Sequence, residues 1–408
     1  MRADSRLVPT YPTGLPLQIL AAATVSGWAR AITVVNLITA LASGGLLYAL
    51  ARRLHIRPLL AAAGVAVLWA CPLFLFTALQ PMSDLSALGW CLAALYGALR
   101  ARDDWRWALA CGICVGLAVL VRPTNLLLAL PVAFALGWRP RAWLALGLGG
   151  LPAAGFLIFY NWRVYGAVLA TGYGDIRSSF SADFLAHNLA HFARWIPALL
   201  SPVVLLALVA PFLTSGRQRG VAVLTVWIVA LVGFYAFYFH SGETWWYLRF
   251  ILPAFPALIL LALLAAQAVG QALVWRRRIT VLLLAAFALA LVLPWKQIRP
   301  AEVLGIEPGE RTYPDAAHWA QQHLPADAAV CCLQMSGAFF YYTDFLIVRW
   351  DQVPPDRMTA LLPALAAAHR PVYAALFPFE TPEALDTVGG HWTKLTIVGQ
   401  VTFWQRQP

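Results

Sequence analysis

Carboxylates that could do chemistry are few in the first 300 residues of this chain. Seven Asp and Glu lie there against 23 Lys and Arg, in strongly apolar surroundings. A carboxylate in such surroundings is costly and is a functional candidate by default. Asp4 belongs to a polar N-terminal stretch, and Asp103 and Asp104 stand among arginines and are interpreted as a solvated loop. The acids that remain as candidates are Asp84, Asp175, Asp183 and Glu243.

Asp84 follows Pro81-Met82-Ser83 and is predicted to begin a helix. Ser83 or Asp84 would then suit the N-cap, where a side-chain oxygen accepts a hydrogen bond from a free backbone N–H. A carboxylate at this place could also act as a general base or orient one. Capping and catalysis are both kept as interpretations, with Asp84 as the candidate catalytic residue.

Two arginines stand at the ends of apolar runs. Arg122 precedes Pro123, and Arg249 begins a long apolar run shortly after Glu243 and Tyr247. An arginine at an interface can extend its head group into water, but its guanidinium fork also matches phosphate oxygens. Glu243 and Arg249 could instead pair with each other. The adjacent Trp and Tyr suit either an interfacial belt or a surface that stacks on a sugar or a prenyl chain.

Polar groups near these arginines complete the candidate site. Asn125 shares a short loop with Arg122, and Asn161 ends an apolar run. Tyr173 lies in a following loop of about thirty residues, which is too long for a simple connector and is a candidate lid. The candidate substrate-binding residues are Arg122, Asn125, Asn161, Tyr173, Glu243, Tyr247 and Arg249.

His187 and His191 are four residues apart, with Asp183 one turn before them. This spacing allows a metal site, but it is more typical of an amphipathic surface helix. The sequence contains no phosphate-binding loop and none of the usual hydrolase or metalloprotease motifs. We therefore predict no metal and no cofactor.

The elements that position these residues are predicted to be membrane-spanning helices. The chain of 408 residues is 61% hydrophobic and 12% charged, with a mean hydropathy of +0.70. Soluble domains are about a quarter charged, and disordered chains are more polar still, so both classes are excluded. Apolar runs of roughly 20 residues indicate about ten spans, near 31–51, 59–80, 84–100, 107–121, 124–138, 142–162, 197–214, 220–240, 250–274 and 279–295.

Arginine clusters in every second loop predict the orientation of these spans. The clusters lie at 52–57, 100–106, 139–141, 217–219 and 276–278 and should face the cytoplasm by the positive-inside rule. The basic excess therefore indicates a membrane and no nucleic acid. The four candidate acids then all fall on the outer side. Polar chemistry is predicted at the outer rim of the bundle.

The composition changes after residue 296. Residues 301–408 carry 6 Lys and Arg against 11 Asp and Glu. A helix is predicted over 312–324 and another over 355–369, with strands at 329–333, 345–350 and 372–376 and a strand pair near 394–404. The predicted fold is mainly α: a polytopic membrane protein with a small C-terminal extracytoplasmic α/β domain. Its parts are an interfacial segment 1–30, a multi-span domain 31–296 and a soluble domain 297–408.

The six cysteines do not indicate a disulfide framework. Cys111 and Cys114 form a C-x-x-C pattern inside an apolar run, where small core residues are the simpler interpretation. Cys331 and Cys332 are adjacent, so they point to opposite faces of any strand.

An ordered set of short motifs extends along nearly the whole chain. The set resembles the bacterial integral membrane glycosyltransferases of the GT-C fold, in the group related to protein O-mannosyltransferases and to aminoarabinose transfer to lipid A. The motifs are Tyr11-Pro12-Thr13-Gly14-Leu15-Pro16, Pro81-Met82-Ser83-Asp84, residues 116–124 with Arg122-Pro123, Tyr160-Asn161, Tyr165-Gly166, Gly172-Tyr173, Arg249-Phe250-Ile251-Leu252-Pro253, Ala317-His318-Trp319, His323-Leu324-Pro325 and Phe340-Tyr341-Tyr342.

This resemblance implies a location in the bacterial inner membrane and a polyprenyl-phosphate-linked sugar donor. The acceptor would be an extracytoplasmic lipid, glycan or protein. It implies inversion at the anomeric carbon, phosphate roles for Arg122 and Arg249, and a second-acid role for Asp84. The family's catalytic acid lies in the loop after the first span, and here the chain begins just before Tyr11, so that acid is expected to be missing. A non-catalytic membrane protein and a lipid or polysaccharide transporter are the alternatives.

Overall fold

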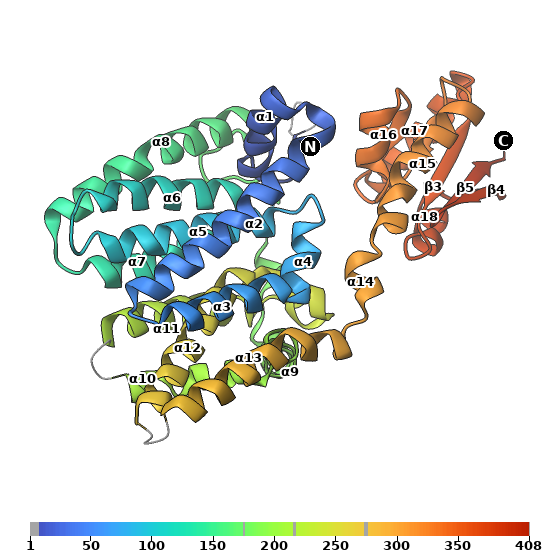
Figure 1. The fold of residues 1–408 in the computed structure, drawn as a ribbon. Helices are drawn as coiled ribbons and strands as arrows, with labels where there is room; N and C mark the ends of the chain where they lie inside the picture. The colour runs from blue at the N-terminus through green and yellow to red at the C-terminus, as the bar shows by residue number, and fades with distance from the viewer. Residues whose placement is uncertain (1–7, 174–175, 215–217, 273–275, 408) are drawn as a thin grey trace. The chain divides into compact units, whose positions relative to one another are not determined.

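The structure is a computed structural model and describes residues 8–173, 176–214, 218–272 and 276–407 (Figure 1). Asp4 and Asp175 lie outside the described residues. The chain forms two compact units, Met1–Val303 and Leu304–Pro408. The first unit is helical, and the second combines helices with a sheet. Each is described by itself below.

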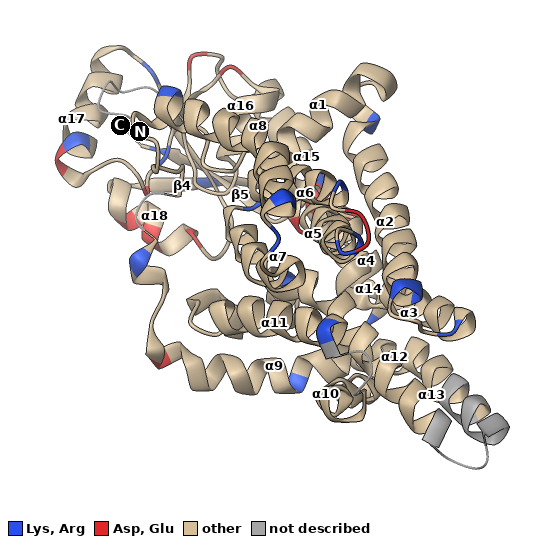
Figure 2. Ribbon diagram, turned by 90° about the vertical axis from the view of Figure 1, so that its left-hand side faces the viewer, with Lys and Arg blue, Asp and Glu red and all other residues tan. Residues whose placement is uncertain are grey.

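The first unit consists of α-helices and 3₁₀ helices. Its charged residues lie mostly at helix ends and in loops, as Figure 2 shows. The helices are α1 (Gly14–Ser26), α2 (Trp28–Arg53), α3 (Pro58–Ala70), α4 (Pro72–Ala78), α5 (Ser83–Arg100), α6 (Trp107–Val121), η1 (Pro123–Leu128), α7 (Ala129–Leu136), α8 (Pro140–Tyr165), η2 (Arg177–Ser179), η3 (Ala182–Phe184), α9 (Leu185–Leu200), η4 (Pro202–Leu208), α10 (Ala210–Leu213), α11 (Gln218–Tyr235), η6 (Phe239–Gly242), η7 (Trp245–Ala254), α12 (Phe255–Ala272), α13 (Arg276–Gln297) and α14 (Pro300–Leu304).

Among the described residues, three helical stretches are long and apolar enough to cross a membrane: Trp28–Arg53, Pro140–Tyr165 and Trp245–Gly270, the last of which joins η7 to α12. The number rises to five when each of two bent helix pairs is counted as one span. Five shorter apolar helices accompany them. The described residues thus form a multi-pass membrane unit, while the predicted count of about ten spans is not confirmed.

Prolines break two of the predicted spans. The run 59–80 bends by 61° between α3 and α4, where Pro72 begins the second helix. The run 197–214 is wrong as a single span, because α9 continues through Pro197 and the chain then bends by 119° at Ser201-Pro202. Proline lacks the N–H that a continuing helix needs, and it disfavours helical backbone in the residue before it.

Glycines allow α6 and α8 to touch along their backbones. A Cβ atom at Gly112 would lie 2.0 Å from the carbonyl oxygen of Leu146, and one at Gly149 would lie 2.1 Å from that of Leu109. Only glycine fits at such a distance, as in the close helix pairs of other membrane proteins. Gly14 of α1 similarly meets the backbone of Leu120 and Val121 at the other end of α6. These contacts fix the helix end that carries Arg122.

The second unit is a five-stranded sheet with helices on both faces. The strand order is β2-β1-β3-β5-β4, with β2, β1 and β3 parallel and with β5 antiparallel to both β3 and β4. Its elements are α15 (Glu307–His323), β1 (Ala329–Cys331), α16 (Ser336–Tyr342), β2 (Leu346–Val348), α17 (Pro355–Ala367), β3 (Val372–Leu376), α18 (Thr381–Val388), β4 (Trp392–Val398) and β5 (Val401–Arg406). The predicted α/β unit is confirmed, and only the short helices α16 and α18 were not predicted.

Two hydrophobic clusters cover the two faces of this sheet. One joins α15 and α16 to the sheet through Ala316, Phe339 and Phe403, and the other joins α17 and α18. Cys332 belongs to the first cluster and Cys331 to the second, so the predicted opposite faces are confirmed. Burial raises the pKa of the Cys331 thiol to about 12, which makes it an unreactive core residue. The structure describes all six cysteines, and all are free thiols.

Candidate active site

A buried ion pair joins the start of α5 to the end of α6. Arg122 Nη2 lies 3.0 Å from Asp84 Oδ1, and the two side chains are only 15% and 3% exposed. Arg122 Nε also donates a hydrogen bond to Ser83 Oγ at 3.2 Å. The capping interpretation is wrong, because Met82 is the N-cap of α5 and no side chain caps this helix. Asp84 instead lies in the first turn, where the helix dipole also favours a negative charge.

The chain turns sharply at Arg122 because a proline follows. Its backbone is extended, with φ −145° and ψ 115°, as expected for a residue before proline. Asn125 is 1% exposed and holds the turn with two hydrogen bonds of 2.9 Å. Its side-chain Nδ2 donates to the carbonyl oxygen of Ala118, and its backbone N–H donates to the carbonyl oxygen of Arg122. Asn125 was predicted to bind substrate, but its side-chain amide nitrogen is engaged with the backbone that presents Arg122.

Arg249 lies beside the same turn. Its Nη1 donates to Met82 Sδ at 3.3 Å, and its Cζ lies 5.3 Å from the ring centroids of Tyr247 and Phe250. Arg122 Cζ lies 5.4 Å from the centroid of the Phe250 ring. The fold therefore brings Arg122 and Arg249 to one aromatic ring, although 127 residues separate them in sequence.

The hydrogen-bonding capacity of this cluster is incompletely used. Arg122 Nη1, Arg249 Nε and Asp84 Oδ1 are buried and have no hydrogen-bond partner among the described residues. Asp84 Oδ1 faces Arg122 at ion-pair distance but without hydrogen-bond geometry. Native structures rarely leave buried polar atoms unpaired, and each exception calls for an explanation. Two buried N–H groups of cations are well suited to receive an anion.

Glu243 does not pair with Arg249, contrary to one interpretation of the sequence. Its carboxylate contacts His240 Nδ1, in a pair whose side chains are 34% and 40% exposed. The His240 ring stacks on Tyr247 at 5.4 Å with parallel planes, and Tyr247 lies under Arg249. Aromatic contacts thus connect the His240–Glu243 pair to the arginines.

Aromatic residues missed in the sequence line this region. Tyr235 stacks on Phe250 at 5.3 Å and donates its hydroxyl hydrogen to Thr124 Oγ1 at 2.9 Å. Tyr238 meets the same ring edge-on, also at 5.3 Å. The run from Phe234 to His240 at the end of α11 was the available signal, because five of its residues are Phe or Tyr beside the predicted outer rim.

The loop after α8 contributes Tyr173. Burial raises the pKa of this phenol to about 12, although the charge of Arg122 acts to lower it. Its ring meets Tyr11 at 6.2 Å, and the loop is held by the bond from Tyr165 Oη to the Pro9 carbonyl. Asn161 has a different place, since its Nδ2 donates to the Val168 carbonyl at 3.0 Å and supports the loop.

The two histidines of α9 bind backbone atoms of the segment that carries Glu243. His187 Nε2 lies 3.0 Å from the Gly242 carbonyl oxygen, and His191 Nε2 lies 3.2 Å from that of Thr244. The sequence favoured an amphipathic surface helix, whereas in the structure both histidines of α9 contact the backbone of a neighbouring segment. Within the described ranges, no group of three or more His, Cys, Asp or Glu residues could hold a metal ion.

Comparison with known proteins gives one family match, which lies within the first unit. Residues 17–162 match the sequence profile of the dolichyl-phosphate-mannose-protein mannosyltransferase family. A search of curated proteins by sequence found no match. The chain has the GT-C fold of integral membrane glycosyltransferases, and its first part is related to the mannosyltransferase family.

Solved structures cover the whole chain. ArnT from Cupriavidus metallidurans in the apo state shares 18% identity and a TM-score of 0.64, covering 100% of this chain and 90% of that chain. The same protein bound to undecaprenyl phosphate gives 15% identity and a TM-score of 0.63, covering 100% and 91%. The arabinofuranosyltransferase AftD from Mycobacteria gives 15% identity and 0.52, covering 96% of this chain and 34% of that chain.

Proposed function

We propose that this chain is an integral membrane glycosyltransferase that takes a sugar from a polyprenyl-phosphate donor. The observation that carries the proposal is the pair of half-buried guanidiniums of Arg122 and Arg249. Each keeps an N–H group without an acceptor among the described residues. Phosphate oxygens match the guanidinium fork, and such charge-assisted hydrogen bonds are strong. The ArnT structure bound to undecaprenyl phosphate supports a lipid phosphate as the ligand.

The two arginines would stabilise the leaving group of the reaction. The acceptor hydroxyl oxygen forms a bond to the anomeric carbon while the bond from that carbon to the phosphate oxygen breaks. The polyprenyl phosphate leaves with the electron pair, and the acceptor proton passes to a carboxylate. A phosphate leaving group needs no protonating acid where cations stabilise its charge. Attack from the opposite side inverts the anomeric carbon.

Asp84 is the carboxylate proposed for the acceptor proton. It lies beside Arg122, and its Oδ1 accepts no hydrogen bond from the described residues. Glu243 is the second candidate, because His240 can orient it and it is more exposed than Asp84. Comparing Asp84→Asn with Glu243→Gln separates the two assignments.

The remaining residues are proposed to shape the substrate site. Tyr247 and Phe250 offer ring faces to the sugar or to the first prenyl units. Tyr173 stays protonated and donates a hydrogen bond towards the phosphate or sugar. Asn125 and Asn161 act through the backbone segments that they hold.

The sides of the membrane and the acceptor complete the proposal. The site lies on the extracytoplasmic side of the bacterial inner membrane, with 1–30 as an interfacial segment and 31–296 as the multi-span domain. Residues 297–408 form the extracytoplasmic domain. The acceptor is a lipid, glycan or protein on that side. The assignment of sides rests on the alternation of arginine clusters between loops, and the inner membrane and the acceptor class rest on the resemblance to membrane glycosyltransferases.

Binding of undecaprenyl phosphate to the purified full chain tests the function. The wild type is expected to bind it, as measured by native mass spectrometry from detergent micelles, and Arg249→Gln should weaken binding by roughly 10- to 100-fold. Arg194→Gln is the matched control, because Arg194 also stacks on an aromatic ring, at 5.0 Å from the Trp195 centroid. Equal binding by the wild type and Arg249→Gln would refute the phosphate site. Binding without release of undecaprenyl phosphate from any donor sugar would favour a non-catalytic membrane protein or a transporter.

A further inference from the structure

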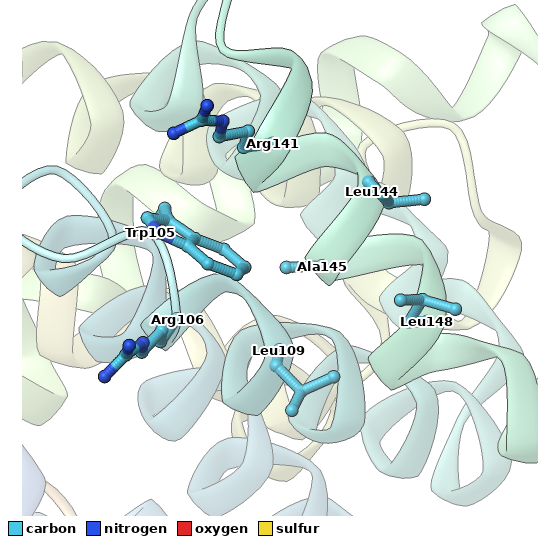
Figure 3. Close-up of a pocket in the computed structure, with 7 residues that line it drawn as sticks. All are labelled: Trp105, Arg106, Leu109, Arg141, Leu144, Ala145 and Leu148. Carbon is cyan, nitrogen blue, oxygen red and sulfur yellow. The ribbon is translucent and has the colours of Figure 1, made fainter.

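A groove lies between α6 and α8, at the end of α6 opposite to Arg122. Its volume is about 490 Å³, and Figure 3 shows the residues that line it. Trp105, Leu109, Leu144 and Leu148 form apolar walls, and Arg106 and Arg141 lie at one end. The candidate active site uses none of these residues.

The packing of the two helices explains why the groove is open. The backbones touch at Gly112 and Gly149, so no side chain separates the helices there. The small side chain of Ala145 is 4% exposed and forms the floor. Leu109, Leu144 and Leu148 stand beside it and are 44%, 67% and 55% exposed. In a membrane these side chains would contact lipid, and only 17% of the apolar window of α8 is buried within the protein.

The arginines at the groove have no acidic partner among the described residues. The nearby Asp103 pairs with Arg53, and Asp104 Oδ1 accepts a hydrogen bond from the backbone N–H of Arg106 at 3.0 Å. Arg106 and Arg141 are exposed, and their guanidiniums form no ion pair or hydrogen bond with any residue that the structure describes. Arg102 and Arg139 add further positive charge, and Arg139 Nη1 donates to the Arg102 carbonyl at 2.8 Å.

We infer that this groove binds an anionic glycerophospholipid, with its phosphate at Arg106 and Arg141 and an acyl chain along Leu109, Leu144 and Leu148. The groove is apolar along its length and cationic at one end, which is complementary to a molecule of that chemistry. Trp105 lines the groove beside the arginines, and tryptophan prefers the level between head groups and chains in a bilayer. The arginine clusters predict this end to be cytoplasmic, where anionic lipids attract basic residues.

The test compares lipids retained by the purified full chain. The protein is transferred into nanodiscs of equal parts phosphatidylglycerol and phosphatidylcholine, and native mass spectrometry counts the lipids that remain bound. The wild type should retain phosphatidylglycerol preferentially, and Arg106→Gln/Arg141→Gln should lower that preference by roughly tenfold. Arg57→Gln is the matched control, because Arg57 is an exposed arginine of the same predicted side outside the groove. An unchanged preference in the double variant would overturn the inference.

A second variant separates the groove from a general basic surface. Leu109→Ser/Leu148→Ser changes two exposed side chains and keeps both arginines, and it should also reduce retention of phosphatidylglycerol. Full retention in this variant would overturn the acyl-chain contact. If 50 mM inorganic phosphate abolished the preference for phosphatidylglycerol, the result would contradict a lipid ligand and favour free phosphate. If undecaprenyl phosphate were the only lipid that displaced the bound phosphatidylglycerol, that result would likewise contradict the inference. Arg249→Gln should keep the preference, because the groove is independent of the proposed catalysis.

Discussion

Two carboxylates are equally buried in this protein, one in each unit, and they differ in how their oxygens are satisfied. Asp84 and Glu380 are both 2% exposed. Glu380 accepts hydrogen bonds at both oxygens: its Oε2 from Leu333 N at 3.0 Å and Trp350 Nε1 at 3.1 Å, and its Oε1 from Phe377 N at 3.1 Å. Asp84 faces one arginine, and its Oδ1 has no hydrogen bond in the described structure.

We propose that this difference separates a structural carboxylate, Glu380, from one available for chemistry, Asp84. Glu380 joins the loops that follow β1 and β3, so its partners are fixed backbone and indole N–H groups, and little capacity is left for a ligand. Asp84 keeps hydrogen-bonding capacity and pairs with Arg122, while Arg249 contacts Met82, two residues before it. Because burial is equal, the state of the hydrogen bonds carries the distinction.

The largest expected effect is on turnover when Asp84 loses its charge. Asp84→Asn should lower the release of undecaprenyl phosphate from undecaprenyl-phosphate sugars by about 10²- to 10⁴-fold, the usual contribution of a general base. Binding of undecaprenyl phosphate should persist, because both arginines remain. The assay follows lipid phosphate release over a panel of donor hexoses and pentoses. Normal turnover in Asp84→Asn with loss in Glu243→Gln would move the catalytic role to Glu243.

Glu380→Ala should act on stability alone. Removal of the carboxylate leaves three buried donors without an acceptor, at a cost of about 3–5 kcal/mol. Hydrogen exchange of peptides covering β3 and α18 in the full chain measures this opening. Glu383→Ala is the control, since Glu383 is exposed in the first turn of the same helix. If Glu380→Ala abolished undecaprenyl phosphate binding while β3 stayed protected, Glu380 would be a functional carboxylate after all.

Arg249→Lys sharpens the role of the guanidinium fork. Lysine keeps the charge but loses the two-pronged hydrogen bonding and the planar stacking on Tyr247 and Phe250. Undecaprenyl phosphate binding should weaken by about tenfold, less than in Arg249→Gln. Native mass spectrometry of both variants makes the comparison. Equal binding by Arg249→Lys and wild type would show that a point charge suffices.

The smallest effect is expected at Tyr173. Its pKa is raised to about 12, so the phenol stays protonated, and any hydrogen bond it donates is lost only as the pH rises towards that value. Tyr173→Phe should weaken undecaprenyl phosphate binding by less than about tenfold, the usual range for one neutral hydrogen bond. Wild-type binding followed from pH 7 to 10 should show no step from this group. A step that disappears in Tyr173→Phe would contradict the protonated phenol.

Much of the fold could be predicted because its signals are local. The strands and the two longer helices of the second unit follow from alternation and helical spacing, and Cys331 and Cys332 face opposite sides as the strand period requires. The short helices α16 and α18 have seven and eight residues, too few for a clear period. The break at Ser201 was missed because the apolar composition continues across Pro202.

The site could be predicted only as a set of residues at one end of the bundle. Arg122 was singled out because it precedes Pro123, and Arg249 because it begins an apolar run. That both contact the Phe250 ring depends on tertiary packing. The same limit applies to Glu243. Its partner is His240, three residues away, whereas Arg249, the partner considered from the sequence, contacts Met82. Spacing along the chain does not specify which neighbour a side chain faces.

Photo-cross-linking by an undecaprenyl phosphate analogue with a photoreactive group next to its phosphate tests the central claim most directly. The full chain is irradiated with the analogue in nanodiscs, and the labelled peptides are identified by mass spectrometry. The account predicts labels in the segments 82–84, 122–125 and 245–250, competed by unlabelled undecaprenyl phosphate and reduced in Arg249→Gln. Labels confined to 105–109 and 141–148, or unchanged labelling in Arg249→Gln, would contradict the assignment of the phosphate to Arg122 and Arg249.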